Sequence, residues 1–544
     1  MNLRIRKIVT VMLTVVMLAG MAIGLAACNN ESAAVNYAKF VFSENEKAPA
    51  KYINVITDDF KKEATIYDAL KLANYKYGFE AKFDEKNPDM PFLKSVAGLQ
   101  PDITQFIGIY ISDVNADVNK DCTKTVDNVT YYMSNKGIAE INLQPDVSYL
   151  FELDEWDNGS AVWKQKLSSS WMEGLSDPII AGDYLYIIKG AKLLKLNKAT
   201  GEQVKEVEMK IAEGSTSFYA LSAPAYADGK IFCAYNGKIQ AFDSDLNSLW
   251  IYTDSIGGAA NSPIVYDNGY IYTGFWNGED SNANYVCIDT KDENVNDAYE
   301  NKTDRWSYTR KGGYYWAGGV IIGNYIVIGG EDGEKAAAKT TIDAFNKATG
   351  EISDQKEIFG DNRSGIAYEE TKKSVYFTTN AGKLYRIWFN KENGTFKTVK
   401  ETDLKYGYTT CTPVIVGNRL YVSSGANGNG AIQVIDADVL KEIYSVDTEG
   451  YSQTTPLVKT YRNGDIYENF VYFTVNKNEG GLYYFVDRAD STYSFKKNLF
   501  IPEKDDANWC ISKISKGDNG VMYYRNDSGT LFAYKHPSYA QEVL

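Results

Sequence analysis

Residues 237–250 read GKIQAFDSDLNSLW: a glycine turn, a short apolar strand, an acidic turn and a tryptophan. Two further turns have a related form, Asn197-Lys198-Ala199-Thr200-Gly201 and Asn346-Lys347-Ala348-Thr349-Gly350, and each follows a short run that contains several apolar residues. Glycine and asparagine turns between short apolar runs are typical of antiparallel strands. Because the pattern recurs far along the chain, it indicates a structural repeat.

These turns divide residues 158–536 into units of one plan. Each unit begins with proline or a small residue and continues with three apolar strands separated by Gly, Asn or Asp turns. The starts lie 39 to 56 residues apart, at Pro178, Pro224, Pro263, Gly319, Gly365, Pro413, Pro456 and about Ser512. The second strands are predicted at 184–188, 230–234, 270–274, 325–329, 374–378, 419–423, 470–474 and 521–524.

A unit with three to four short strands is the size of a propeller blade. One blade cannot bury both of its faces, so blades stack around an axis. The fold class predicted is mainly β: an eight-bladed β-propeller over 158–536, preceded by a small α+β domain and followed by a tail over 537–544. Seven blades is the alternative. We expect Ala161–Leu167 to pair with the strand that ends at Phe532–Tyr534 and so close the ring.

These repeats resemble the pyrroloquinoline-quinone-type (quinoprotein-like) β-propeller family, on Gly237–Asp243, Trp250 and the two Ala-Thr-Gly turns. That family includes quinoprotein dehydrogenases and non-catalytic assembly lipoproteins, so the resemblance implies the fold more than the function. The dehydrogenases carry a disulfide between adjacent cysteines over the cofactor, and this chain has no adjacent cysteines. We therefore do not expect pyrroloquinoline quinone (PQQ) as a cofactor, nor an enzyme.

Residues 50–155 have a different pattern. Lys51–Val55 alternates as a strand does, and Thr65–Ala73 places apolar residues at helical spacing. Further strands are predicted at Phe106–Ile111, Val129–Met133 and within Ile141–Phe151. This order predicts a small α+β domain.

Four segments of this domain resemble motifs of the transcobalamin C-terminal domain family: Thr65–Leu70, Val96–Leu99, Phe106–Ser112 and Gly137–Phe151. In the vertebrate carriers this domain helps to enclose a corrinoid, so the resemblance implies a corrinoid as one candidate ligand. The chain departs from the family in lacking the strand tryptophan and in carrying Pro145-Asp146 where Gly-Asp is usual.

Residues 1–27 combine a basic start with an apolar run, Ile8–Leu25, and lead into Leu25-Ala26-Ala27-Cys28. This resembles a bacterial lipoprotein signal peptide, which implies cleavage before Cys28 and lipidation of its sulfur. A transmembrane helix is the alternative. We expect an exported protein anchored in the lipid bilayer through Cys28, at the outer face of the cell membrane or of an outer membrane, with 28–49 as a tether.

Composition excludes several classes of function. The single histidine, His536, makes Ser-His-Asp catalysis improbable and a multi-histidine metal site unattainable within the chain. The net charge of −14 disfavours nucleic acid as a partner. The five cysteines after Cys28 are widely spaced, which favours buried free thiols, with one disulfide as the alternative.

The segments before the unit starts should all lie on one face of the ring. Five residues before each start, four of the eight positions hold tyrosine. Tyr and Trp bury a large area and keep a polar tip, so we predict an aromatic mouth that binds a ligand. Its predicted residues are Trp171, Tyr219, Tyr314, Tyr315, Trp316, Arg363, Tyr406, Tyr408, Tyr451 and Trp509. Packing between blades is the alternative, and Trp163, Trp250 and Trp306 are expected to be structural.

A calcium site is a further candidate in the N-terminal domain, because acidic and amide residues alternate there. They are Asp113, Asn115, Asp117, Asn119 and Asp121. The spacing is that of a calcium loop without its central glycine and terminal glutamate. A strand or hairpin with one solvent-exposed face has the same period of two residues.

Three functions follow. The first is a surface binding protein that captures a corrinoid, a glycan or another ligand and hands it to a membrane transporter. The second is a scaffold for protein–protein interaction in the envelope. The third is a quinoprotein-like enzyme.

Overall fold

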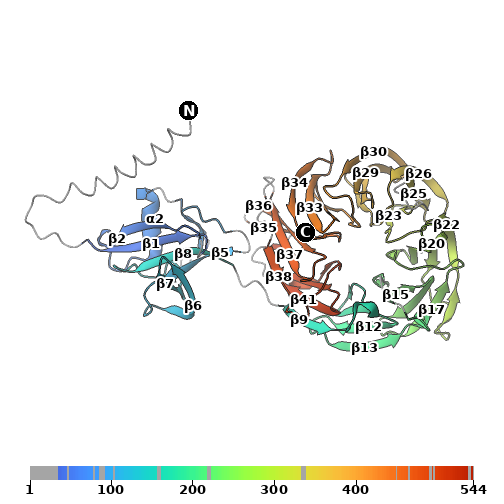
Figure 1. Cartoon of the computed structure of the whole chain (residues 1–544), viewed down its shortest axis with the longest axis horizontal. Coiled ribbons are helices and arrows are strands. Elements are labelled where there is room, and N and C mark those ends of the chain that lie inside the picture. Colours follow the sequence, from blue (N-terminus) through green and yellow to red (C-terminus); the bar gives the residue numbers. More distant parts are fainter. Residues whose placement is uncertain are drawn as a thin grey trace, which may run out of the picture. The chain divides into compact units, whose positions relative to one another are not determined.

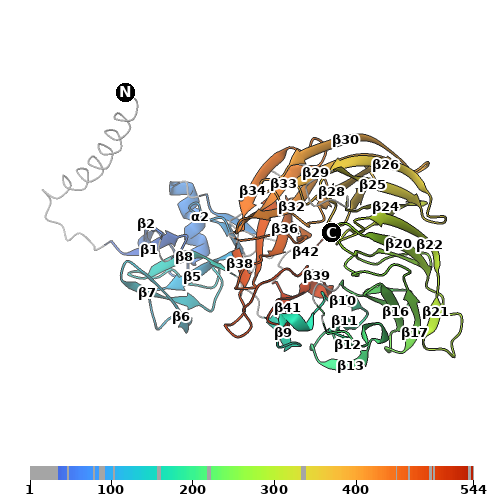
Figure 2. The same cartoon turned by 45° about the vertical axis from the view of Figure 1, so that its right-hand side comes forward.

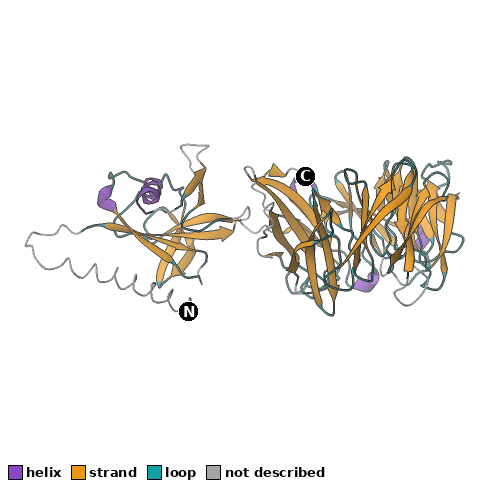
Figure 3. Ribbon diagram, turned by 90° about the horizontal axis from the view of Figure 1, so that it is seen from above, coloured by secondary structure: helices purple, strands orange, loops and turns teal. Residues whose placement is uncertain are grey.

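The computed structural model describes residues 35–45, 48–77, 80–84, 92–101, 105–155, 161–216, 218, 222–331, 339–448, 450–463, 466–488, 493, 497–536 and 541–542. The chain divides into two compact units, 1–101 with 105–154 and 102–104 with 155–544. Cys28 and the predicted signal peptide before it lie outside the described residues, as does all of the tail except 541–542. Strands dominate both units (Figure 3).

The first unit is a six-stranded sheet, in the order β2-β1-β8-β5-β7-β6, with one α-helix against it (Figure 1). Its strands are β1 Tyr37–Ser43, β2 Lys51–Ile56, β5 Gln105–Ile111, β6 Val118–Val126, β7 Val129–Ser134 and β8 Ser148–Glu155. A separate hairpin, β3 Lys82–Asp84 with β4 Phe92–Ser95, and a short 3₁₀-helix, Thr57–Asp59, complete it.

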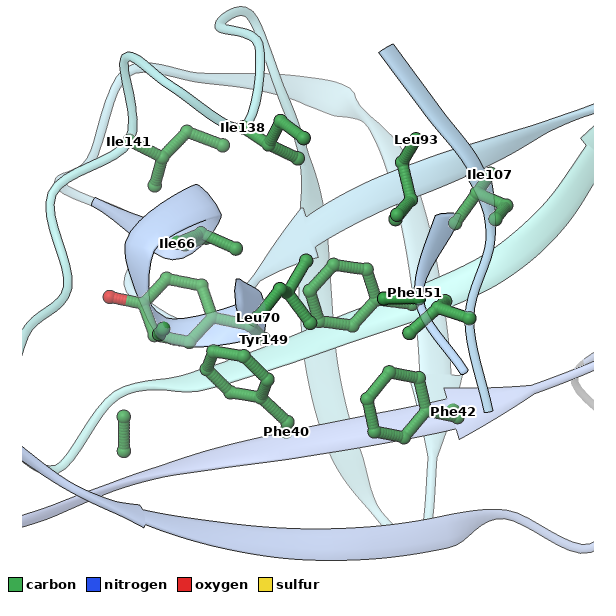
Figure 4. Close-up of a cluster of buried hydrophobic side chains, with 14 of the residues drawn as sticks. Phe40, Phe42, Ile66, Leu70, Leu93, Ile107, Ile138, Ile141, Tyr149 and Phe151 are labelled. Atoms are coloured by element: carbon green, nitrogen blue, oxygen red, sulfur yellow. The ribbon is translucent and has the colours of Figure 1, made fainter. Parts of the chain in front are cut away.

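The helix α2, Ile66–Tyr77, begins where Thr65 and Asp68 cap each other. The Asp68 N–H donates to Thr65 Oγ1 (3.3 Å) and the Thr65 N–H donates to Asp68 Oδ2 (2.9 Å). Figure 4 shows Ile66 and Leu70 of this helix facing Phe40 and Tyr149 of the sheet. The helix and the strand at 51–56 lie where the sequence predicted a helix and a strand.

The expected tether over 28–49 requires a correction. Tyr37–Ser43 forms β1, which pairs antiparallel with β2 and parallel with β8. This segment forms a strand because every second residue is apolar: Ala38, Phe40 and Phe42 are buried in the core of the unit. Within the described chain, folded structure therefore begins before residue 50.

The described residues of the second unit form eight blades of four antiparallel strands each (Figures 1 and 2). Two blades carry one extra strand at an edge. The eight predicted second strands lie within β11, β15, β19, β24, β28, β32, β36 and β40, so the eight-bladed prediction is confirmed.

The strands of blades 1 to 4 have the following bounds. Blade 1 is β10 Ile179–Ala181, β11 Tyr184–Lys189, β12 Lys192–Asn197 and β13 Gln203–Glu208. Blade 2 is β14 Ala225–Ala227, β15 Lys230–Tyr235, β16 Lys238–Asp243 and β17 Ser248–Thr253, with β21 Glu300–Lys302 beside β17. Blade 3 is β18 Val265–Asp267, β19 Tyr270–Gly274, β20 Asn282–Asp289 and β22 Asp304–Lys311. Blade 4 is β23 Val320–Ile322, β24 Tyr325–Gly329, β25 Lys339–Asn346 and β26 Ile352–Phe359.

The other four blades follow the same plan. Blade 5 is β27 Ala367–Glu369, β28 Ser374–Thr378, β29 Lys383–Asn390 and β30 Thr395–Asp403. Blade 6 is β31 Val414–Val416, β32 Arg419–Ala426, β33 Asn429–Asp436 and β34 Glu442–Asp447. Blade 7 is β35 Leu457–Asn463, β36 Ile466–Thr474, β37 Leu482–Arg488 and β38 Lys497–Phe500, with β42 Gln541–Glu542 beside β35. Blade 8 is β39 Ser515–Lys516, β40 Val521–Arg525, β41 Thr530–Lys535 and β9 Ala161–Lys166.

The ring is closed by β9, which precedes all other blade strands in the sequence. It pairs antiparallel with β41, and Trp163 lies opposite Ala533. This confirms the closing strand predicted from residues 161–167. No helix in the part of the chain that the structure describes has both the length and the apolar character to cross a membrane.

Candidate functional site

The innermost strands of the propeller surround a central hollow of about 680 Å³, a size that suits a small-molecule site. Each of the eight blades contributes to its wall. One residue from each blade, in order, is Leu175, Ser222, Asn261, Trp316, Arg363, Thr410, Gln453 and Ile511. The wall therefore mixes apolar, amide, hydroxyl and charged groups.

Most of these wall residues share one position in the repeat. Trp316 and Arg363 both lie four residues before the first residue of their innermost strands, β23 and β27. The same spacing holds for Leu175, Asn261, Thr410, Gln453 and Ile511. This position, and not the tyrosine position, faces the hollow.

The tyrosines singled out in the sequence lie two residues earlier, and they do not form one ring. Tyr219 lies outside the described residues. Tyr408 and Tyr451 are half-buried with ring centroids 6.4 Å apart, and they do not line the hollow. Burial raises the pKa of the Tyr408 hydroxyl. Tyr406 also does not line the hollow.

The placement of Tyr314 at the mouth is wrong. Its side chain is fully buried, with its ring centroid 5.1 Å from that of Tyr285. Gly274 leaves the space for it, because a Cβ there would lie 2.5 Å from the Tyr314 Cβ. At this position the packing alternative holds.

Four predicted residues do line the hollow: Trp171, Tyr315, Trp316 and Arg363. Tyr315 stacks on Trp316, with ring centroids 4.5 Å apart and planes at 22°. Tyr315 also contacts Trp276, with ring centroids 4.5 Å apart and planes at 42°. We call Trp276, Tyr315 and Trp316 the aromatic wall.

Trp276 was not predicted, because it follows the second strand of blade 3 rather than preceding an innermost strand. In a four-stranded meander, the loops after the second and fourth strands open on the same face. Glu331 stands in the equivalent loop of blade 4 and was also missed. That rule of topology is the signal that could have found both residues.

Arg363 is held against the aromatic wall by carboxylates. Its guanidinium lies over the Tyr315 ring at 5.0 Å. Its Nε donates to Glu331 Oε1 at 2.5 Å, and its Nη2 lies 3.4 Å from Glu279 and 3.8 Å from Asp361. The guanidinium is therefore directed by charge pairs and by the ring face together.

A second charged group occupies the wall at blades 8 and 1. Arg525 Nη1 donates to Asp527 Oδ1 at 3.1 Å, and its Nε lies 3.6 Å from Asp177 Oδ1. The Lys513 N–H donates to Asp177 Oδ2 at 3.2 Å. Burial raises the pKa of the Asp527 carboxyl. The hollow therefore carries charges of both signs.

Large apolar side chains are exposed beside this group. Trp171 is 60% exposed, Met172 64%, Trp509 49% and Ile511 37%. Trp509 O accepts from the Asp527 N–H, and Gly529 O accepts from the Ser168 N–H, so both segments lie against one turn of blade 8. We call these four residues the apolar rim.

The calcium candidate lies in the first unit. Asp113 Oδ1 accepts from the Asn115 N–H (2.9 Å) and Asp117 Oδ1 accepts from Asn135 Nδ2 (3.0 Å). Asn119 and Asp121 belong to β6. Among the described residues, no group of three or more His, Cys, Asp or Glu side chains is placed to hold a metal ion. Calcium binding stays a prediction.

A family model described as outer membrane protein assembly factor BamB matches residues 149–292. A comparison with curated proteins gives no match. Three similar solved structures are BamB from Moraxella catarrhalis, quinohemoprotein alcohol dehydrogenase from Comamonas testosteroni and Sqt1 from Saccharomyces cerevisiae.

BamB is 12% identical, with 69% of this chain and 99% of that chain covered and a TM-score of 0.46. The dehydrogenase is 12% identical, with 71% and 78% covered and a TM-score of 0.48. Sqt1 is 10% identical, with 70% and 100% covered and a TM-score of 0.49. Residues 149–292 are thus similar to the BamB repeat family, and the described residues from 161 to 292 belong to the eight-bladed β-propeller.

Proposed function

We propose that this chain is a non-catalytic binding protein of the cell envelope, and that its propeller holds a partner protein against the loops around the central hollow. The apolar rim carries the proposal, since Trp171 and Ile511 line the hollow and the exposed side chains of Met172 and Trp509 lie within two residues of them in the chain. Clustered exposed apolar side chains mark interaction sites, and Trp is enriched among the residues that dominate interface affinity.

Two features of the chain support this proposal. The family model that matches 149–292 is described as an outer membrane protein assembly factor. The apolar segment that ends at Cys28 would deliver the chain to the outer face of a membrane and anchor it there by lipid. A tethered propeller is suited to holding another envelope protein in place.

The non-catalytic part of the proposal rests on the side chains available. The single histidine, His536, is 6% exposed, and its Nδ1 lies 2.7 Å from the Tyr472 hydroxyl. His536 does not line the hollow. The sequence has no adjacent cysteines of the kind that quinoprotein dehydrogenases place over their cofactor.

Capture of a small ligand inside the hollow is the second candidate. The observation that favours it is the stack of Tyr315 on Trp316 in a space of about 680 Å³. A flat or amphipathic ligand such as a corrinoid, or a glycan, would pack on these rings and bond to Asn261 and Gln453. Transfer to a membrane transporter would follow from such capture.

A photo-cross-linking amino acid at Met172 tests the first candidate in the cells that make the protein. We expect a discrete adduct with one partner protein, and we expect the pair Trp171→Ala and Trp509→Ala to abolish it. The control is the same amino acid at Tyr299, which is 54% exposed in the insertion that carries β21. Equal adducts at both positions, or adducts that survive the tryptophan changes, would contradict the proposal.

Thermal unfolding of the chain beginning at Asn29 tests the second candidate, with cobalamin, cobinamide and glycans added in turn. A ligand that binds the native state raises the unfolding midpoint by mass action. We expect Trp316→Ala to remove that rise, whereas Tyr299→Ala should leave it unchanged. A midpoint that no compound moves would exclude these ligand classes.

A further inference from the structure

One buried carboxylate connects three blades. Glu331, which follows β24 in blade 4, is 1% exposed. Its Oε2 accepts from Trp276 Nε1 of blade 3 at 3.1 Å, and its Oε1 accepts from Arg363 Nε of blade 5 at 2.5 Å. These two partners are an edge of the aromatic wall and the cation that lies over the central ring of that wall.

The backbone of Glu331 is held independently of its carboxyl group. The Glu331 N–H donates to Gly313 O (3.0 Å), and Glu331 O accepts from Arg310 Nε (3.0 Å). Arg310 in turn pairs with Asp343 at 2.9 Å. The main chain is therefore fixed, and a change at the carboxyl group acts on Trp276 and Arg363.

The charges that face this carboxyl come from blade 5 and from the loop of blade 3. Arg363 attracts its charged form, whereas the Asp361 carboxylate repels it. Glu279 contacts Arg363 from the other side, and the Tyr408 hydroxyl is a further titratable group near Arg363 and Glu331. Burial raises the pKa of the Glu331 carboxyl from 4.5 to about 7, with Arg363 opposing the rise and Asp361 adding to it.

We infer that Glu331 is a positioning residue whose protonation sets the arrangement of the aromatic wall and frees Arg363. In the charged form, Glu331 pairs with Arg363 and holds it over Tyr315. In the protonated form, the charge attraction to Glu331 is lost, and Arg363 keeps its contact with the Tyr315 ring and its longer contacts to Glu279 and Asp361. The guanidinium then becomes available to an anionic group that enters the hollow.

The inference rests on the second candidate function, capture in the hollow, only in taking the aromatic wall as a binding surface. Binding at the hollow then depends on pH near neutrality. A partner that contacts Trp316 would find the wall ordered above the midpoint, whereas one with a carboxylate would gain Arg363 below it. The regulation belongs to the site and does not require a particular ligand.

Fluorine NMR of the 5-fluorotryptophan-labelled chain, beginning at Asn29 and without any ligand, tests the inference. The Trp276 resonance is assigned by its loss in Trp276→Phe. We expect it to shift with a midpoint near the Glu331 pKa of about 7 and to stay constant with pH in Glu331→Gln. In Arg363→Gln the midpoint should move to higher pH, because the cation that favours the charged form is gone.

Glu279→Gln is the matched control, because it removes a carboxylate from Arg363 but leaves the Trp276 bond to Glu331 in place. It should keep the titration, and the Trp306 resonance between blades 3 and 4 should not move in any variant that is folded. A Trp276 resonance that is constant with pH in the unsubstituted chain, or that still titrates in Glu331→Gln, would overturn the inference. Neither result bears on the cross-linking at Met172, so the failure of one proposal is separate from the failure of the other.

Discussion

Trp306 Nε1 donates a hydrogen bond to the main-chain oxygen of Lys347 at 3.0 Å. Trp306 lies in β22, the outermost strand of blade 3, and Lys347 begins the turn after β25 in blade 4. The indole lies directly over Gly350 of that turn, where a Cβ would come within 2.6 Å of the ring. Trp163 makes the same contacts with Lys198 O (3.1 Å) and Gly201, so the repeated turn is a docking point between blades.

Replacement of this glycine should loosen the contact between blades 3 and 4. In Gly350→Ala the added methyl must displace the Trp306 ring, and the backbone stays at a φ of 75°. We expect a loss of about 2–4 kcal/mol of unfolding free energy, as for other overpacked and strained sites. Urea unfolding measures it.

Gly417→Ala is the control for that variant. Gly417 has a similar positive φ of 59°, but nothing lies within 4 Å of its Cβ position. Gly417→Ala should lower the unfolding free energy only through the strain of a side chain at positive φ, by about 1 kcal/mol. Equal losses in the two variants would contradict the role given to the Trp306 ring.

Blades 6 and 7 are joined by a buried carboxylate in place of a tryptophan. Asp487 is 0% exposed and accepts from Arg419 Nη1 (3.1 Å) and the Tyr421 hydroxyl (2.6 Å); the Tyr444 hydroxyl donates to it as well. Asp487→Ala leaves the Arg419 charge without this partner, so we expect a loss of about 3–5 kcal/mol in chemical unfolding. Glu370→Gln breaks the exposed pair with Lys391 and should leave the unfolding free energy almost unchanged, because solvent screens an exposed pair. Comparable losses in both variants would show that Asp487 is not a structural centre.

The stability of the propeller should depend on pH through Glu331. Its native pKa of about 7 lies above the ordinary 4.5, so the native state binds this proton more tightly than the unfolded state. The contribution of this proton to the free energy of unfolding is fully present below pH 4.5 and is lost as the pH rises through 7. Urea unfolding free energies of the unsubstituted chain should therefore fall more steeply between those values than those of Glu331→Gln. Parallel pH profiles would be inconsistent with a raised pKa at this residue.

Thiol labelling should separate the cysteines by burial. The five described cysteines are free; Cys233, Cys287, Cys411 and Cys510 are buried, and Cys122 is half-buried. This agrees with the free thiols expected from their spacing. Burial raises the pKa of the Cys287 thiol to about 12, and thiols react as thiolates. In the chain beginning at Asn29, mass spectrometry should find iodoacetamide at Cys122 first and at all five only after unfolding; early labelling of Cys411 would contradict this burial.

The sequence was sufficient for the plan of the propeller because the evidence for each blade is local. A strand, a turn glycine and a following apolar run lie within a few residues of one another, and they recur once per blade. The closing strand could also be predicted, since Ala161–Leu167 had strand character and no blade of its own. In the first unit the same local alternation at Ala38, Phe40 and Phe42 was present but was assigned to a tether.

By itself, therefore, the sequence indicated eight blades, with seven as the alternative, and the order of the strands within each blade. Only the tertiary structure decided which side chains line the hollow. Trp316 has a φ of 57°, so the segment before β23 does not keep the alternation of a strand, and Tyr314 enters the core instead of the mouth. Glu331, Trp276 and Arg363 meet because the ring brings blades 4, 3 and 5 together, and no local pattern connects residues so far apart in the chain.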